Sequence, residues 1–471
     1  MQVIKNYLYN VCYQVFVLIV PVITTPYIAR VLGPQGVGIN SYTNSVIQYF
    51  ILFGSIGIDL YGNKKIAFVR DNKQKLTESF YEIFTLRIIT VIIAYALFLI
   101  FLMFNSRFRV YYLAQSISII ATAFDISWFF MGVEDFAVTV IRNFVVKILT
   151  VVSIFLFVKS YADLSLYILI LSVSVFAGNI TMFHSLGKYL YNTHIHKVEF
   201  LVHLKPSLLL FIPQVAIQIY WVLNKTMLGI MVSVKAAGYF DQSDKMVKII
   251  LAIVTATGTV MLPHVANAFA KGKYQKTRKY LYNSFSFVSA ISIPMTFGLI
   301  AIAPKFISLF LTSKFNSVTP IIIIESFIIW LISWSSVMGT QYLLPTNQNK
   351  AYTISVMLGA IVNLIANIPL ILCLGAVGAA VATVISEATV TITQFIIIKG
   401  QINYHKLFAE THKYLLSGII MFITTYFLNK ELPTTWLMLA IEILVGIICY
   451  STGLVILKSK VIFKIKNLIK E

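Results

Sequence analysis

The stretch PYIARVLGPQGVG, Pro26–Gly38, ends the first long apolar run of the chain and determines the direction in which the chain continues. Pro26 lies inside an apolar segment that begins near Tyr7, and a proline in a helix interior predicts a kink. Gly33 followed by Pro34 then predicts a tight turn before apolar sequence resumes. The stretch therefore predicts two apolar helices joined by a sharp reversal, with Arg30 placed between the kink and the turn.

The composition of the whole chain is that of a polytopic membrane protein. The chain has 471 residues, of which 59% are hydrophobic and 11% charged, and its mean hydropathy is +0.85. Apolar runs of about 20 residues recur along it, and they predict about fourteen transmembrane helices and an all-α fold. Every connector is short, which argues against an enzyme because no loop is long enough to form a catalytic domain.

The positive charges lie mostly in alternate connectors, so the positive-inside rule predicts that both termini are cytoplasmic and that Arg30 is at the outer face. Lys and Arg outnumber Asp and Glu by 37 to 17. These charges are spread over connectors rather than gathered on a soluble face, so membrane lipids are the expected partner and nucleic acid is not. The sequence predicts a multi-pass protein of the cytoplasmic membrane.

A short internal similarity predicts a repeated architecture. The turn Gln35–Gly38 has a counterpart at Lys235–Gly238, and each precedes a new helix. We predict an N-terminal lobe of six helices, a cytoplasmic linker, a second six-helix lobe and two additional helices with a basic tail. The corresponding ranges are 1–190, 191–205, 206–400 and 401–471.

Charged residues inside the apolar runs are the candidate site, because an ionisable group at membrane depth costs about 2.5–3.5 kcal/mol and needs a partner or a function. We expect Asp125 and Arg142 to form an ion pair between two neighbouring helices. Lys147 is left without a partner near the middle of its helix, which favours a functional role. Lys225 and Lys248 lie in a second charged region that internal pairing with Asp side chains also explains.

Other charges leave alternatives open. Glu387 is the deepest carboxylate of the later helices, and it fits an ion-coupling site, a helix pair with Asn363 or Asn367, or a protonated acid. Arg87 and Asp59 lie close enough to helix ends to extend to lipid headgroups. Metal-ligand spacings and phosphate-binding loops are absent, so the sequence predicts no metal, no cofactor and no catalytic residue.

Several stretches resemble the bacterial oligosaccharide flippases of the multidrug/oligosaccharidyl-lipid/polysaccharide exporter superfamily. They are Pro26–Gly38, SWFFMGVEDFAVTVIRNFVVK (Ser127–Lys147), FIPQVAIQIYWVLNKTMLG (Phe211–Gly229), AAGYFDQSDKMVKI (Ala236–Ile249) and TVMLPHVANAFAKGK (Thr259–Lys273). The resemblance implies a two-lobed helical bundle that moves an undecaprenyl-pyrophosphate-linked oligosaccharide between leaflets. It also implies a polysaccharide polymerase and chain-length or export proteins as partners. Asn224 and His264 depart from the pattern, which often has an acidic residue and an arginine there.

The residues and the resemblance agree on one expectation. Positive side chains screen the pyrophosphate on its way through roughly 30 Å of hydrocarbon, and the candidates are Arg30, Arg142, Lys147, Lys225 and Lys248. Lys147 and Lys225 are the expected pyrophosphate ligands, and Arg30 fits an outer gate or exit. Two alternatives stay open: a cation-coupled multidrug exporter of the same superfamily, and a membrane polymerase or glycosyltransferase.

Overall fold

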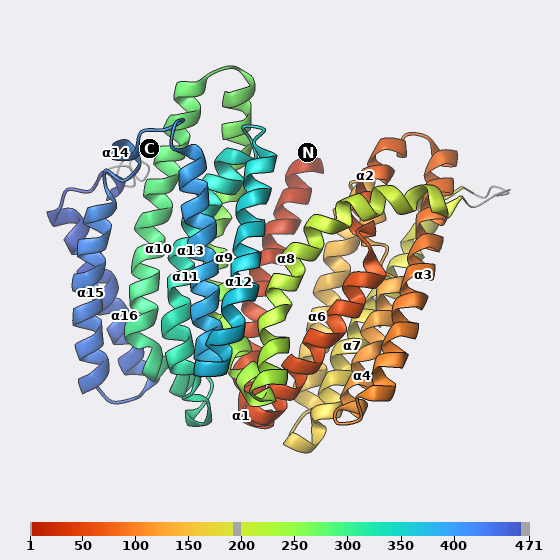
Figure 1. The fold of residues 1–471 in the computed structure, drawn as a ribbon, viewed down its shortest axis with the longest axis horizontal. Coiled ribbons are helices and arrows are strands. Elements are labelled where there is room, and N and C mark those ends of the chain that lie inside the picture. Colours follow the sequence, from red (N-terminus) through yellow and green to blue (C-terminus); the bar gives the residue numbers. More distant parts are fainter. Residues whose placement is uncertain (1, 192–198, 463–471) are drawn as a thin grey trace. The chain divides into compact units, whose positions relative to one another are not determined.

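The computed structural model describes residues 2–191 and 199–462, and it divides into two compact units, Met1–Gly229 and Ile230–Glu471 (Figure 1). The described residues form helices joined by turns and short loops. The α-helices of the first unit are α1 (Gln2–Ser55), α2 (Ile58–Val69), α3 (Lys73–Phe104), α4 (Arg109–Ala123), α5 (Ser127–Gly132), α6 (Phe136–Phe157), α7 (Leu164–Thr181) and α8 (Leu204–Met231, whose last residues pass into the second unit). Its 3-10 helices are η1 (Tyr161–Asp163), η2 (Met182–Lys188) and η3 (Phe200–His203).

The second unit contains eight further α-helices. They are α9 (Val234–Ala270), α10 (Tyr274–Phe310), α11 (Val318–Met338), α12 (Asn349–Leu374), α13 (Ala376–Ile398), α14 (Tyr404–Leu407), α15 (Thr411–Glu431) and α16 (Trp436–Ile456). The short helices η4 (Ser313–Phe315) and η5 (Gly339–Leu343) flank α11.

The predicted reversal after the first apolar run is present in α1. Its backbone stays helical through Pro21 and Pro26, and the non-helical residue is Gly33, with φ 63° and ψ −178°. Figure 1 shows the N-terminal arm of α1 running from the N label to a turn near the α1 label, where the chain folds back. Only glycine adopts this backbone conformation readily. Pro34 then begins the second arm, where its missing N–H removes no helical hydrogen bond.

Aromatic side chains form the core at one end of the first unit. Phe80, Trp128 and Phe129 are almost completely buried in one cluster, with Phe80 stacked on Trp128 at a centroid separation of 5.8 Å. Gly62 permits this packing, because a Cβ there would lie 2.6 Å from the Trp128 ring. His203 of η3 fixes the beginning of α8 to the same region.

The start of α8 follows the predicted linker 191–205, of which residues 192–198 lie outside the described residues. The His203 ring is buried between the Tyr61 hydroxyl, 2.6 Å from Nδ1, and the Glu82 carboxylate, 2.8 Å from Nε2. Most of α8 belongs to the first compact unit, which ends at Gly229. The predicted second lobe begins at residue 206, and its boundaries stay a prediction. The predicted basic tail is described as far as residue 462.

The fold class predicted from the sequence is confirmed: the described chain is helical and polytopic. Ten described helices are long and apolar enough to cross a membrane, or eleven if a bent pair in α9 is counted as one span. The predicted reversal helps to explain why this number is lower than the expected one, since both arms of α1 and α2 are counted as a single segment, Phe16–Val69. The exact figure of fourteen stays a prediction.

Candidate functional site

Helix α6 carries two of the predicted cationic residues, and its packing against α1 sets their depth. Phe16 contacts Phe144 and Tyr27 contacts Phe155, with ring centroids 4.2 and 4.4 Å apart. The two pairs are equally spaced on both helices, so the first arm of α1 and α6 run parallel and in register. The Tyr27 hydroxyl closes this contact by donating to the Val158 carbonyl at 2.6 Å.

Lys147 lies at mid-length of the 22-residue helix α6. At 1.5 Å per residue it is about 16 Å from either end, close to half of the roughly 30 Å hydrocarbon thickness. The side chain is half-buried, and among the described residues it has no hydrogen-bond or ion-pair partner. It lies one turn from Phe144, on the side of α6 toward α1. A charge in this position is costly unless it meets water or an anion.

Asp125 and Arg142, predicted to pair with each other, have other contacts. Asp125 lies in the break between α4 and α5, where its Oδ1 accepts the Ser127 backbone N–H at 2.9 Å. The Arg142 guanidinium points toward α7 and donates to Met182 Sδ at 3.4 Å. Asp125 therefore stabilises the start of α5, because its carboxylate accepts a helix-terminal N–H that has no partner within the helix.

Arg30 and Lys225 lie elsewhere in the first unit. Arg30 is exposed and lies within a turn of Tyr27, next to the end of α6. Lys225 is half-buried near the C-terminal end of α8, beside the buried Asn224. That part of α8 packs directly on α1, where Ser45 and Thr226 share a hydrogen bond of 2.9 Å. Arg30 therefore lies on α1 itself, and Lys225 lies on a part of α8 that contacts α1.

The charged turns of α9 in the second unit are internally paired. Lys245 Nζ lies 2.5 Å from Asp241 Oδ2, and Lys248 Nζ lies 2.7 Å from Asp244 Oδ2. Both pairs follow the i, i+4 spacing that places side chains on one helix face. Asp244 offsets the charge of Lys248. Lys248 is therefore a weaker candidate for binding an anion than Lys147.

Glu387 is buried in α13, 8% exposed, in the part of the second unit where α12 and α13 pack together. The neighbouring Ser386 donates to the Gly359 carbonyl of α12 at 2.6 Å. The two predicted partners of Glu387 bond to each other, with Asn367 Nδ2 donating to Asn363 Oδ1 at 2.8 Å. Glu387 is thus a buried carboxylate next to a polar contact between α12 and α13, and its role in ion coupling stays a prediction.

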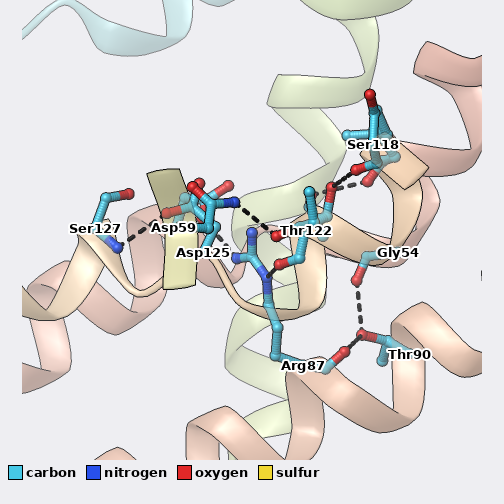
Figure 2. Close-up of polar contacts among 12 residues, drawn as sticks. Gly54, Asp59, Arg87, Thr90, Ser118, Thr122, Asp125 and Ser127 are labelled. Atoms are coloured by element: carbon cyan, nitrogen blue, oxygen red, sulfur yellow. Dashed lines mark hydrogen bonds and ion pairs between the residues drawn. The ribbon is translucent and has the colours of Figure 1, made fainter. Parts of the chain in front are cut away.

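Arg87 is a buried centre that sequence reasoning missed (Figure 2). Its side chain is 1% exposed, so the expectation that it extends to lipid headgroups is wrong. Its Nη1 donates to Asp59 Oδ1 at 2.6 Å and its Nε to the Thr122 carbonyl at 2.9 Å. One turn along α3, Thr90 donates to the Gly54 carbonyl at 2.7 Å. Helix α3 thereby binds the ends of α1, α2 and α4 at the breaks in their chains.

A second missed centre joins α10 to the last two helices, α15 and α16. Lys305 of α10 is 2.5 Å from Glu442 of α16, and the side chains are 6% and 0% exposed. Asn429 of α15 donates to the other Glu442 carboxylate oxygen at 2.7 Å. A buried carboxylate requires such partners, so the presence of Glu442 inside an apolar helix was the available signal.

The fold and its charges define a polytopic α-helical membrane protein with cationic side chains inside its helical units. Its fold is similar to that of the lipid II flippase MurJ in an inward closed conformation, with a TM-score of 0.78, 20% identity, and coverage of 97% of this chain and 100% of that one. It is also similar to an inward-facing multidrug-resistance MATE family transporter of the MOP superfamily, with a TM-score of 0.62, 12% identity, and coverage of 84% and 94%.

The model of the polysaccharide biosynthesis protein family matches residues 3–269, more than half of the chain, and the protein belongs to this family. A protein of Escherichia coli (strain K12) that is named for O-antigen transport is 21% identical over 408 residues, with coverage of 84% of this chain and 96% of the relative. Lipid II flippase MurJ of Bacillus subtilis (strain 168) is 26% identical over 165 residues, with coverage of 34% and 30%.

Proposed function

We propose that this protein is a flippase that moves undecaprenyl-pyrophosphate-linked oligosaccharide repeat units from the inner to the outer leaflet of the cytoplasmic membrane by alternating access. The product would serve the synthesis of a capsule or another surface polysaccharide. The family, the MurJ-like fold and the relative named for O-antigen transport support a lipid-linked sugar as the substrate. The observation that carries the proposal is Lys147 at mid-length of α6.

The role of Lys147 follows from the electrostatic cost of the substrate. A pyrophosphate carries several negative charges, and hydrocarbon solvates none of them. An ammonium group at the middle of the crossing offsets part of this cost through charge-assisted hydrogen bonds, while the polyprenyl chain stays in lipid. In this proposal Lys147 and Lys225 bind the pyrophosphate, Arg30 acts at the exit, and Arg142 and Lys248 contribute positive potential.

The test replaces Lys147 by Met, which keeps the side-chain length and removes the charge. Loss of a charged hydrogen bond worth about 1.5–3 kcal/mol predicts a fall in export of about tenfold to a hundredfold. Lys147→Arg should retain most of the export, and the exposed Lys64→Met is the matched control. Export of surface polysaccharide and the amount of protein in the membrane are measured together. Normal export by Lys147→Met at normal abundance would refute the assignment.

The same cells distinguish the alternative functions. A flippase defect leaves lipid-linked repeat units on the inner leaflet, whereas a polymerase defect leaves them on the outer leaflet. A multidrug exporter would leave polysaccharide unchanged and alter sensitivity to cationic drugs. Measuring which leaflet holds the lipid-linked units in a deletion strain therefore decides among the three.

A further inference from the structure

The turn between α9 and α10 in the second unit forms an open pocket that the proposed transport path does not use. Its volume is about 870 Å³. Gly272, at φ 67°, lets the chain leave α9. Its N–H donates to the Phe269 carbonyl and the Lys273 N–H donates to the Ala268 carbonyl, each at 2.9 Å. These two bonds form a Schellman motif, which fixes the turn at the base of the pocket.

The pocket is lined by positive and aromatic side chains and by no carboxylate. It contains three lysines, two tyrosines, two amide side chains and one glycine: Lys273, Lys276, Lys279, Tyr274, Tyr280, Gln275, Asn283 and Gly272. All three lysines line the pocket, and the lining residues include no acidic group that would neutralise them. Such a surface attracts phosphate groups.

Ring contacts hold the two tyrosines in place. Tyr274 lies against Phe269 at a centroid distance of 5.7 Å, and Tyr280 lies against His264 at 6.1 Å. Lys276 is 5.6 Å from the centre of the Tyr280 ring, which aligns its ammonium group with that wall of the pocket. The pocket thus offers aromatic faces beside positive charges. Aromatic faces and amide groups suit the apolar faces and hydroxyls of a sugar.

We infer that this pocket binds the pyrophosphate–sugar headgroup of the lipid-linked substrate on the cytoplasmic side, before transport. The inference rests on the proposed function. The positive-inside rule places the α9–α10 turn, with Lys271, Lys273, Lys276, Arg278 and Lys279, at the cytoplasmic face. The volume matches the range of about 300–1,000 Å³ that encloses a multi-ring ligand, whereas a phosphatidylglycerol headgroup would fill little of it.

The experiment measures lipid binding to the purified full-length protein by native mass spectrometry. The probes are undecaprenyl pyrophosphate and, separately, phosphatidylglycerol. All variants are made in a Lys147→Met background, which removes one of the two proposed central ligands and leaves the pocket intact; Lys225 is the same in every variant, so it cannot account for a difference between them. The pocket variant is Lys276→Gln with Lys279→Gln. The control is Lys271→Gln with Arg278→Gln, which removes the same charge from the same turn outside the pocket lining.

The pocket variant should bind undecaprenyl pyrophosphate at least about tenfold more weakly, since each lysine near an anionic headgroup contributes about fivefold. The control should change binding by less than about threefold. Equal losses in both variants would overturn the inference in favour of diffuse surface charge. The inference would also be overturned if phosphatidylglycerol bound as tightly as undecaprenyl pyrophosphate and lost as much affinity in the pocket variant. The pocket would then be a general anionic-lipid site.

Failure of this inference and failure of the proposed function give different results. If Lys147→Met exports normally while the pocket variant loses pyrophosphate binding, the central role of Lys147 fails and the pocket stands. If Lys147→Met stops export while the pocket variant binds undecaprenyl pyrophosphate normally, the pocket fails and the proposed function stands.

Discussion

Arg87 and Asp59 show how a single ion pair can hold together three interrupted helices. The guanidinium is almost completely buried, and it satisfies a carboxylate of α2 and a terminal carbonyl of α4 at the same time (Figure 2). Lysine has one nitrogen and lacks the planar fork that serves both acceptors. The pair therefore couples the break at Gly57 to the break at Asp125.

Asp59→Ala should destabilise the first unit, because it leaves the Arg87 charge buried without its carboxylate. Breaking a fully buried pair costs about 3–5 kcal/mol, and the 48% exposure of the Asp59 side chain reduces the expected loss to about 2 kcal/mol. The thermal unfolding midpoint of purified protein in detergent measures it, with the exposed Asp71→Ala as control. Adding Arg87→Met to Asp59→Ala should restore part of the stability; further loss in the double variant would contradict the argument.

The sequence indicated the position of some charged residues and missed the contacts of others for a physical reason. Lys147 was identifiable because its depth follows from counting residues along one helix. The partner of Arg87 was not identifiable in this way. The pairing depends on the helix break after Ser55, which brings Asp59 to the side of α3. The expected pair of Asp125 and Arg142 rested on equal depth alone, and the α4–α5 break turned Asp125 toward its own backbone.

At the scale of helices, the reversal in α1 depends on Gly33. Its φ of 63° and ψ of −178° fall in a region open essentially to glycine, and no atom lies within 4 Å of the position a Cβ would take. Gly33→Ala should therefore cost about 1–3 kcal/mol from backbone strain alone. Gly187→Ala is the matched control, because its surroundings are equally open and its φ is not positive. Equal unfolding midpoints for the two variants would refute the strain argument.

The last two helices are joined to α10 by the buried contact of Lys305, Glu442 and Asn429. Glu442→Gln should lower stability by about 3 kcal/mol, because it leaves the Lys305 charge in an apolar environment. Glu431→Gln, at the exposed end of α15, should be close to neutral. Lys305→Met combined with Glu442→Met should recover most of the loss, since an apolar pair needs no compensation. Unfolding midpoints in detergent test the series, and a double variant less stable than Glu442→Gln alone would contradict it.

The sequence predicted where a helix ends when the end depends on residues at that position alone. The Gly33 turn was predicted because glycine and proline act on their own backbone. The contact of the end of α8 with α1 was not, because it depends on packing between residues that are distant in the sequence. Ser45 bonds Thr226, and a Cβ at Gly229 would lie 2.0 Å from the Tyr42 ring, so the end of α8 fits closely against α1.

For the whole molecule, the two units share a design in which glycine turns separate long apolar helices and buried charges join them. Arg87 with Asp59 serves this purpose in the first unit, and Lys305 with Glu442 in the second. Lys147 differs from these four residues, since no described residue compensates it. An ionisable residue inside a transmembrane segment is by default a candidate functional residue. The contrast within one chain is the main argument for a transported anion.

The orientation of the whole chain gives the last prediction, because the flippase proposal and the headgroup pocket both require the α9–α10 turn to be cytoplasmic. In a background with Cys12, Cys373 and Cys449 replaced by Ala, Lys271→Cys should be protected from a membrane-impermeant maleimide in intact cells and labelled after permeabilisation. Ser106→Cys, exposed in the turn between α3 and α4, should be labelled in intact cells. The opposite labelling pattern would place Lys273, Lys276 and Lys279 outside the cell. The pocket would then face the leaflet that receives the product, and inward-to-outward transport could not begin there.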